Sequence, residues 1–276
     1  MIVSFHPLIK ADKNIICAGR EPNAKDLAAI KAARAVILSQ GCSRSLYEMA
    51  RANCQNVFPN YDARFKYPYK IGQIRLFRQI NISHPPTEIY PDVASFQRRP
   101  QKSPSEPALD YPFVFKLNWG GEGDTVYLVK STEDFGNILR QTSEFEKSGQ
   151  TGFMLQEFIS SGNKTLRVVV IGQRLISYWR ILQNPGAFHT NLSKGAIIDS
   201  EAEPELQRKA AALIKDVCRK TGINLAGFDV IFSSADEDPC PMLLEINYFF
   251  GRRGIGGSEA YYSILQEQVR TWLAGI

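Results

Sequence analysis

Two carboxylates and one amide stand in the last fifth of the sequence at spacings that could hold a divalent cation. Asp229 lies in the apolar run AGFDVIF, and Glu245 and Asn247 lie in MLLEINYFFGRRG. Residues two apart on a strand face the same side, and a hairpin partner could place Asp229 beside them. Carboxylate and amide oxygens suit the hard ion Mg²⁺ and do not suit zinc. The alternative is an ion pair between Glu245 and Arg252 or Arg253, with the amide only capping a turn.

A lysine inside a buried-strand pattern is the second candidate for chemistry. Lys116 lies in YPFVFKL, and the segment NWGGEGD, which contains Gly120, Gly121 and Gly123, follows directly. A lysine is costly in such a strand unless its ammonium group reaches an anion, and glycines let backbone amides approach phosphate oxygens. The segment is not a Walker A loop, which requires GxxxxGK[ST]. An exposed edge lysine followed by an ordinary hairpin turn is the alternative.

Cysteine and histidine are not arranged for metal binding or nucleophilic catalysis. The five cysteines form an odd set without a CxxC pair, and the three histidines are scattered along the chain. We therefore expect reduced thiols in a cytoplasmic protein. Any metal chemistry must use carboxylates. No Ser/His/Asp or Cys/His arrangement is present that would support a protein nucleophile.

Composition limits the remaining classes of protein. The chain has 276 residues, 44% of them hydrophobic and 22% charged, which is an ordinary globular composition that can bury a core. No apolar run approaches the roughly 18 residues of a membrane span. The first ten residues do not combine a charged start with an apolar block, so no targeting signal is expected.

The net charge of +5 is unevenly distributed. Residues 1–110 hold 16 Lys and Arg against 9 Asp and Glu, whereas the remainder holds 17 against 19. A basic front half suits an anionic partner, although a solvated surface explains it equally well. Residues 56–79 interleave aromatic and basic side chains, as a surface for single-stranded nucleic acid would. We expect these aromatic side chains in the core, so nucleic acid is the less favoured partner.

The elements that must position these residues begin with an alternating pattern. Strands are expected over 15–18, 35–38 and 56–58, and helices over 24–33 and 45–52. Strands separated by helical segments of about ten residues pair in parallel, which predicts an open α/β sheet. The unit contains no GxGxxG, so dinucleotide binding is not expected there.

A polar segment with three prolines, 97–110, is predicted to be a linker or an exposed loop. After it the pattern becomes rich in strands. Strands are expected over 113–117, 125–129, 152–159, 166–171, 174–181, 225–232 and 242–246, and helices over 134–145, 204–220 and 261–273. The short turn at Gly172 and Gln173 predicts an antiparallel hairpin, because it cannot form a parallel crossover.

Taken in order, these motifs resemble those of the ATP-grasp enzymes, and most closely the glutathione synthetase and ribosomal-protein glutamate ligase branch. The resemblance covers about residues 60–276 and rests on KIGQIRLF, YPFVFK with its glycine loop, LQEFI, LRVVVIG, HTNLSKG, AGFD and LLEIN. It implies an ATP-grasp fold of the α/β class, built from α+β lobes. The expected domains are a short N-terminal α/β domain, 1–66, and an ATP-grasp domain, 67–276, with a small lobe of about 67–157 and a large lobe of about 158–276.

The resemblance implies a nucleotide site between the two lobes. Lys70 and Lys116 would contact the phosphates of ATP, and the loop with Gly120, Gly121 and Gly123 would close over them. A hinge between the lobes would recognise adenine through its main chain. The residues that match this hinge are Gln156, Glu157, Phe158 and Ile159.

The resemblance also implies the groups that act on the transferred phosphate. Asp229, Glu245 and Asn247 match magnesium ligands, and Mn²⁺ would substitute for Mg²⁺ there. Charge on the phosphate and on an acyl phosphate would be stabilised by three residues, Arg180, Asn191 and Lys194. Arg167 would organise the same region or form a structural ion pair.

Two departures from the family pattern concern substrate contacts. An acidic residue that commonly binds ribose is replaced by Thr165, so Glu157 or Asn163 would have to compensate. After Asn247 the sequence YFFGRRG stands where relatives often have a small residue and proline. We therefore expect an unusual acceptor pocket shaped by Tyr248, Phe249, Phe250, Arg252 and Arg253.

The function implied is an ATP- and Mg²⁺-dependent ligase that joins a carboxylate to an amine, or to a thiol, through an acyl phosphate. ATP drives the reaction, and lobe closure excludes water from the intermediate. The expected partners are small-molecule carboxylates and amines, or a peptide or protein terminus, with no membrane and with a homodimer left open. A regulator that binds ATP without turnover is the alternative, followed by a single-stranded nucleic-acid-binding protein.

Overall fold

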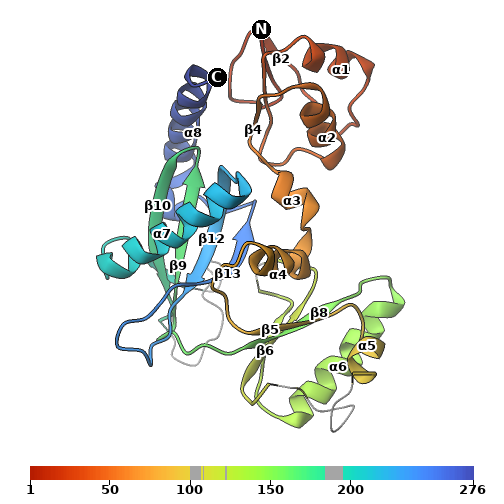
Figure 1. Cartoon of the computed structure of the whole chain (residues 1–276), viewed down its shortest axis with the longest axis vertical. Helices are drawn as coiled ribbons and strands as arrows, with labels where there is room; N and C mark the ends of the chain where they lie inside the picture. Colours follow the sequence, from red (N-terminus) through yellow and green to blue (C-terminus); the bar gives the residue numbers. More distant parts are fainter. Residues whose placement is uncertain (100–106, 108, 122, 184–194) are drawn as a thin grey trace.

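Three separate β-sheets organise the described part of the chain (Figure 1). The structure is a computed structural model that describes residues 1–99, 107, 109–121, 123–183 and 195–276. One four-stranded sheet is N-terminal, a second four-stranded sheet lies in the middle of the sequence, and a five-stranded sheet follows. This mixed architecture agrees with the α/β class expected from the sequence.

The N-terminal sheet is entirely parallel, with strand order β2-β1-β3-β4. Its strands are β1 (Ile2–Ser4), β2 (Lys13–Asn14), β3 (Ala35–Ile37) and β4 (Val57–Phe58), and its helices are α1 (Ala24–Lys31) and α2 (Arg44–Asn53). The predicted open parallel sheet is present, but the predicted strand over 15–18 is wrong. The strand β2 ends at Asn14, and although Cys17 is buried in the core and Ile15 packs against it, Ile16 is 79% exposed. Strand β1 takes an interior position of the sheet.

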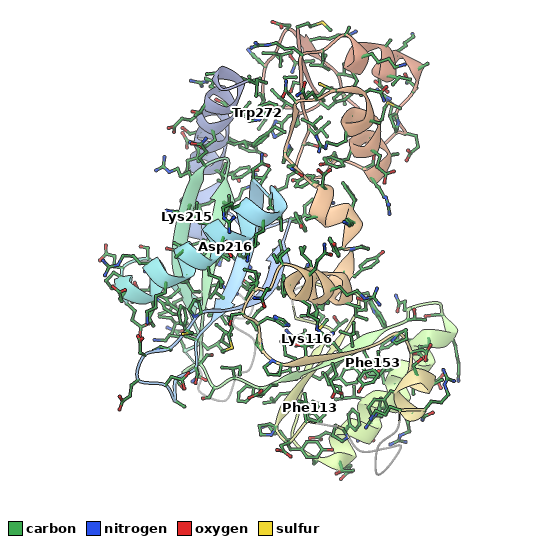
Figure 2. All side chains as sticks on the ribbon, viewed as in Figure 1. Phe113, Lys116, Phe153, Lys215, Asp216 and Trp272 are labelled. Atoms are coloured by element: carbon green, nitrogen blue, oxygen red, sulfur yellow. The ribbon has the colours of Figure 1, made fainter. Side chains whose placement is uncertain are left out.

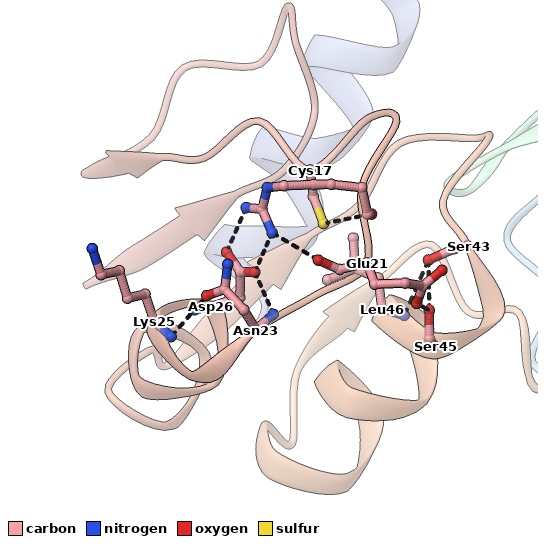
Figure 3. Close-up of polar contacts among 9 residues, drawn as sticks. Cys17, Glu21, Asn23, Lys25, Asp26, Ser43, Ser45 and Leu46 are labelled. Carbon is pink, nitrogen blue, oxygen red and sulfur yellow. Dashed lines mark hydrogen bonds and ion pairs between the residues drawn. The ribbon is translucent and has the colours of Figure 1, made fainter.

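Helix α1 begins where the sequence supplies a capping box. The side chain of Asn23 accepts hydrogen bonds from the amides of Lys25 and Asp26, and the Asp26 carboxylate accepts one from the Asn23 amide (Figure 3). These bonds satisfy amides that have no partner within the helix. Arg20 holds the same carboxylate through Nη1 and Nη2 at 2.6 and 2.8 Å. Ser43 caps α2 through the amide of Leu46.

Two helices that the sequence analysis did not predict, α3 (Asp62–Lys66) and α4 (Tyr69–Gln79), follow the N-terminal sheet. They fall in the aromatic and basic stretch. Its Phe58, Tyr61 and Phe77 side chains are at most 1% exposed and belong to the core, whereas Tyr69 is 67% exposed. For these three rings the expectation that the aromatic side chains lie in the core is confirmed.

The middle sheet is antiparallel, with strand order β5-β8-β6-β7. Its strands are β5 (Thr87–Tyr90), β6 (Phe113–Leu117), β7 (Val126–Val129) and β8 (Phe153–Glu157), and its helices are α5 (Val93–Gln97) and α6 (Thr132–Lys147). The sequence analysis missed β5 and α5. Most of the predicted linker, 97–110, lies outside the described residues. Stacked aromatic rings such as Phe115 and Phe153, with centroids 4.8 Å apart, fill the core of this sheet (Figure 2 labels Phe113 and Phe153).

The five-stranded sheet is also antiparallel, with strand order β11-β10-β9-β12-β13. Its strands are β9 (Lys164–Ile171), β10 (Arg174–Ile181), β11 (Ile197–Asp199), β12 (Leu225–Ile231) and β13 (Met242–Asn247). Helices α7 (Pro204–Thr221) and α8 (Gly257–Ala274) accompany it, and a short 3₁₀ turn spans Arg253–Ile255. The predicted hairpin is confirmed, with Gly172 at a φ of +61° in its turn.

The N-terminal and five-stranded sheets share one continuous hydrophobic core, whereas the middle sheet has a core of its own. Helix α8 runs from the five-stranded sheet to the N-terminal sheet, where Trp272 packs on Phe58 with ring centroids 5.5 Å apart (Figures 1 and 2). The domain limits 1–66 and 67–276 stay a prediction. No helix within the described ranges is long and apolar enough to cross a membrane.

Candidate functional site

A cavity of about 450 Å³ is lined by residues of the middle sheet and of the five-stranded sheet. This volume is in the range of pockets that hold small molecules. Its charged lining residues are Lys70, Lys116, Glu157, Arg167, Arg180, Asp229 and Glu245. The cavity therefore brings together the cations and carboxylates that the sequence analysis singled out from separate motifs.

Lys116 occupies an interior strand of the middle sheet, so the edge-lysine alternative is wrong. Strand β6 lies between β8 and β7, and the Lys116 side chain lines the cavity. Figure 2 labels Lys116 on the middle sheet. Its Nζ donates a hydrogen bond to Oε1 of Gln156 at 2.7 Å. Burial lowers the pKa of Lys116 to about 8, although the charge of Glu245 acts in the opposite direction. The ammonium group is thus held in a place where it has lost part of its hydration.

The glycine loop closes the hairpin between β6 and β7 beside Lys70. Nζ of Lys70 donates to the carbonyl oxygens of Trp119 and Gly120 at 2.8 and 2.9 Å. Gly120 has a φ of +81°, and a Cβ there would lie 2.5 Å from Cγ2 of Thr125, so only glycine fits. Burial lowers the pKa of Lys70, partly offset by Glu245.

Other glycines of this loop face the cavity. Gly121 and Gly123 line it, and Gly123 has a φ of +80°. Space is open around Gly121, where a Cβ would meet no atom within 4 Å. The loop thus offers backbone close to the cavity, as phosphate binding would need.

The predicted hinge lies at the end of β8, where the chain passes the cavity. Glu157, Phe158 and Ile159 all line it, and the amide of Glu157 donates to the carbonyl of Pro86 at 2.9 Å. Gln156 also lines the cavity, but it is only 1% exposed and both ends of its side-chain amide are bonded within the middle sheet. Adenine recognition by this segment stays a prediction.

The predicted metal ligands lie together on adjacent strands. Asp229 of β12 is the register partner of Glu245 of β13, as expected for a hairpin. Nδ2 of Asn247 donates to Oδ2 of Asp229 at 3.1 Å, which leaves Oδ1 of the amide as an oxygen donor. Among the described residues no three His, Cys, Asp or Glu side chains form a cluster, so the set depends on the amide as well as on both carboxylates. Its all-oxygen chemistry fits Mg²⁺.

The alternative pairing of Glu245 with a nearby arginine is not observed. Arg252 lies over the rings of Tyr261 and Tyr262, 4.4 and 4.6 Å from their centroids, and bonds to Ser258. In the described part of the chain no ion pair involves Glu245. Burial and then the negative charge of Asp229 raise the pKa of Glu245, and a bound cation would relieve both effects.

Two arginines fix Asp229 in the wall of the cavity. Nε of Arg167 and Nη2 of Arg180 lie 2.5 and 2.8 Å from Oδ1 of Asp229. Burial alone would raise the pKa of this carboxyl, but the two guanidinium groups outweigh it and hold the pKa below its usual value. Within the described chain, Nε of Arg180 is buried without a hydrogen-bond partner, which is a donor available to a ligand.

Thr165 stands close to the arginines. Its hydroxyl accepts a hydrogen bond from Nη2 of Arg180 at 2.9 Å, and its side chain lines the cavity. Asn163, which also lines the cavity, lies two positions before Thr165 in the sequence. Contacts to a ribose stay a prediction for these residues. Asn191 and Lys194, predicted to act on the phosphate, lie outside the described residues.

The expected acceptor pocket needs a correction. Tyr248 and Phe250 are 9% and 8% exposed and belong to the hydrophobic core, so they cannot shape a pocket directly. Phe249 alone of the three aromatic residues lines the cavity, and it is 61% exposed. Phe249 is therefore the aromatic side chain of this segment that lines the cavity.

Gln73, which no sequence pattern singled out, connects α4 to β13, the strand of the predicted metal ligands Glu245 and Asn247. The side-chain amide of Gln73 donates to the carbonyl of Ile246 and accepts from its amide, both at 2.8 Å. Strand β13 is an edge strand, and this amide takes the place of a neighbouring strand between Glu245 and Asn247. No local pattern could have indicated it, since 173 positions separate the partners.

The fold and the motifs define the class of protein. The model of the RimK-like ATP-grasp domain family matches residues 70–264, and the chain therefore belongs to this family. The resemblance seen in the sequence is thereby confirmed.

Among solved structures, a RimK-domain ATP-grasp protein from Sphaerobacter thermophilus covers 97% of this chain and 99% of its own, with a TM-score of 0.61 and 14% identity. D-alanine–D-alanine ligase from Bacillus anthracis covers 96% and 88%, with a TM-score of 0.59 and 14% identity. At these identities the likeness shows the ATP-grasp fold.

Individual relatives carry the name of a particular ligase. A probable alpha-L-glutamate ligase from Xanthomonas oryzae is 31% identical over 147 residues, which are 53% of this chain and 46% of that protein. A protein of the same name from Azotobacter vinelandii is 27% identical over 167 residues, which are 59% of this chain and 52% of its own length. The chain spans about half the length of the curated relatives it matches.

Proposed function

We propose that the chain is an ATP-dependent ligase that joins a carboxylate to an amine through an acyl phosphate. The observation that carries this proposal is the cavity in the ATP-grasp fold, where four buried or part-buried cations surround two carboxylates beside a glycine loop. Such an excess of positive charge in a desolvated cavity suits a polyphosphate.

The residues that line the cavity would each bind a different part of the nucleotide. Lys70 and Lys116 bind phosphate oxygens, and the turn at Gly121 and Gly123 covers them. The segment from Gln156 to Ile159 provides the edge against which adenine lies. These assignments place the transferred phosphate near Arg180, whose unpartnered Nε donates to it.

The acidic residues would hold magnesium. Oxygen atoms of Asp229, Glu245 and Asn247 form the donor set, with Mn²⁺ as a substitute. When bound, the ion neutralises phosphate charge and aligns the phosphate groups. Arg167 and Arg180 keep Asp229 ionised and oriented for this role. Asn191 and Lys194 are proposed to stabilise the same phosphate.

The reaction follows from the weakness of a carboxylate as an electrophile. Transfer of the γ-phosphoryl group from ATP to the carboxylate makes an acyl phosphate and releases ADP. Attack by the amine then forms the amide bond, with loss of a proton from nitrogen, and releases inorganic phosphate. No protein nucleophile is required, and exclusion of water protects the intermediate. Glutamate is the first substrate to test, because the relatives are named alpha-L-glutamate ligases. A peptide or protein terminus is an equally suitable second substrate class.

One experiment tests nucleotide binding and turnover together. The melting temperature is measured with and without ATP or ADP and Mg²⁺, and phosphate release is then measured with a panel of carboxylates and amines that includes glutamate. We expect both nucleotides to raise the melting temperature by mass action. An unchanged melting temperature at millimolar nucleotide would refute the nucleotide site. Binding without release across the panel would favour the regulator.

A further inference from the structure

A hydrogen-bonded chain inside the middle sheet ends on the ammonium group of Lys116. The Thr87 hydroxyl donates to the carbonyl oxygen of Pro85 at 2.7 Å. The same hydroxyl oxygen accepts from Nε2 of Gln156 at 2.8 Å. Oε1 of Gln156 then accepts from Nζ of Lys116 at 2.7 Å. Three side chains from β5, β8 and β6 are therefore bonded in series.

The direction of this chain is fixed by its first bond. A hydroxyl has one proton, and Thr87 gives it to a carbonyl oxygen that can only accept. The hydroxyl must therefore accept from the NH₂ end of the Gln156 amide. That requirement turns the carbonyl end of the amide toward Lys116. Gln156 is 1% exposed and Thr87 is 8% exposed, so water does not compete strongly for these bonds.

We propose that Gln156 and Thr87 are positioning residues that hold the Lys116 ammonium group in the cavity without neutralising it. This inference rests on the proposed function, in which Lys116 binds a phosphate group. A carboxylate in place of the amide would hold the lysine more strongly but would cancel its charge. A neutral acceptor fixes the place of the ammonium group and leaves its charge, and two of its three donors, for an anion.

Other charged groups set the environment of the lysine. Glu245 on β13 and Asp229 on β12 favour its charged form, whereas Lys70 on α4 disfavours it, and burial is the largest effect. Within the described residues, Gln156 is the one hydrogen-bond acceptor of this ammonium group. The pKa of Lys116 should therefore respond to small changes at Gln156.

The test measures the pKa of Lys116 by NMR titration of its ¹³Cε signal in the free protein, assigned by its absence in Lys116→Arg. Gln156→Glu should raise that pKa by about one pH unit or more, because a carboxylate favours the charged form. Gln156→Leu should lower it below the wild-type value of about 8, because the ammonium group loses its acceptor. Thr87→Val should shift it in the same direction as Gln156→Leu, since the amide is then free to turn. Thr87→Ser, which keeps the hydroxyl, should restore the wild-type pKa.

A purely structural role predicts a different result. It would lower the melting temperature of the variants and leave the pKa of Lys116 unchanged, and this outcome in Gln156→Glu and Thr87→Val would overturn the proposal. Those two variants decide the matter if Gln156→Leu does not fold. ATP affinity is then measured, and it should fall in Gln156→Glu although the lysine is more fully protonated. The titration needs no nucleotide. Failure of the wild-type protein to bind ATP would therefore refute the proposed function, while the pKa of Lys116 in the variants would still test the positioning role of Gln156 and Thr87.

Discussion

Ion pairs occur both at the helix ends of the N-terminal sheet and in the walls of the cavity, but their surroundings differ. Near the N-terminal sheet, Arg20 pairs with Asp26 while its side chain is 37% exposed, and the pair of Arg44 with Glu48 is exposed on both sides. In the cavity, Arg167 and Arg180 both pair with Asp229, and the three side chains are only 7% to 12% exposed. Asp26 is itself only 3% exposed, but Arg20 and both residues of the Arg44 pair keep contact with water, whereas all three cavity side chains have lost most of it.

The two regions differ in charge balance as well. Each N-terminal pair matches one cation with one carboxylate. Among the described residues, the cavity has four cations against the two carboxylates Asp229 and Glu245, with Glu157 exposed at the end of β8. Uncompensated charge in a desolvated place is unfavourable for folding, so its presence indicates a ligand that supplies the missing negative charge. The contrast separates charges that stabilise helices from charges that form a site.

The largest effect on activity is expected at the predicted metal ligands, Asp229, Glu245 and Asn247. Glu245→Gln keeps the shape of the side chain but removes the charge that offsets Mg²⁺, so ATP-dependent phosphate release should fall by about 1,000-fold with the fold preserved. Adenosine binding should largely survive. Glu48→Gln, at an exposed pair of α2, is the matched control and should leave release unchanged. Equal rates of phosphate release for Glu245→Gln and Glu48→Gln would show that the cavity charges matter no more for activity than the exposed ion pairs of the N-terminal region.

The next effect concerns the lysines of the cavity. Lys116→Ala and Lys70→Ala should each weaken ATP binding by about 10- to 100-fold, which corresponds to the loss of a hydrogen bond to a charged group. Isothermal titration calorimetry checks this. Lys215→Ala, on the exposed side of α7, is the control (Figure 2). Unchanged affinity in both cavity variants would show that the phosphates lie elsewhere.

A smaller, pH-dependent effect is expected in the N-terminal region. Burial, followed by the charge of Arg252, lowers the pKa of His6 to about 4 from an unfolded value of 6.5. The unfolded chain therefore binds more protons between these values, and the free energy of unfolding should decrease by roughly 2 kcal/mol as pH falls from 6.5 to about 4. His6→Asn cannot titrate and can still accept from the Leu8 amide, so its denaturant-unfolding curve should lose this part of the pH dependence. A wild-type slope retained in the variant would contradict the assignment.

The smallest effect is expected at a helix cap. Asn23→Ala removes the acceptor of two amides of α1 and should lower the free energy of unfolding by about 1 kcal/mol. Chemical denaturation measures the loss, and ATP affinity should not change because the cap is outside the cavity. A change in affinity comparable to that of the lysine variants would mean that the N-terminal sheet is coupled to the site.

The local sequence pattern was sufficient to predict the strands that contain the candidate site residues. The apolar run around Lys116, the short turn at Gly172 and the pairing of Asp229 with Glu245 all follow from alternation and turn length, which act over a few residues. The apolar run at 15–18 misled the prediction because β1, although only three residues long, takes the central place in the sheet. Helix α4 was missed because its lysine and aromatic residues were interpreted as a motif and a surface.

The sequence by itself determined the ATP-grasp class, the candidate cations and carboxylates, and the hairpin that brings two of the predicted metal ligands together. Only the tertiary structure decided which side chains these groups meet. Lys70 bonds to carbonyls of the glycine loop about 50 positions away, and the side chain of Gln156, a residue of the predicted hinge, holds Lys116. Gln73 supports the strand of Glu245 from 173 positions away. Periodicity reports which face of an element is buried, but contacts between distant segments depend on how the sheets pack, and that packing has no local signature.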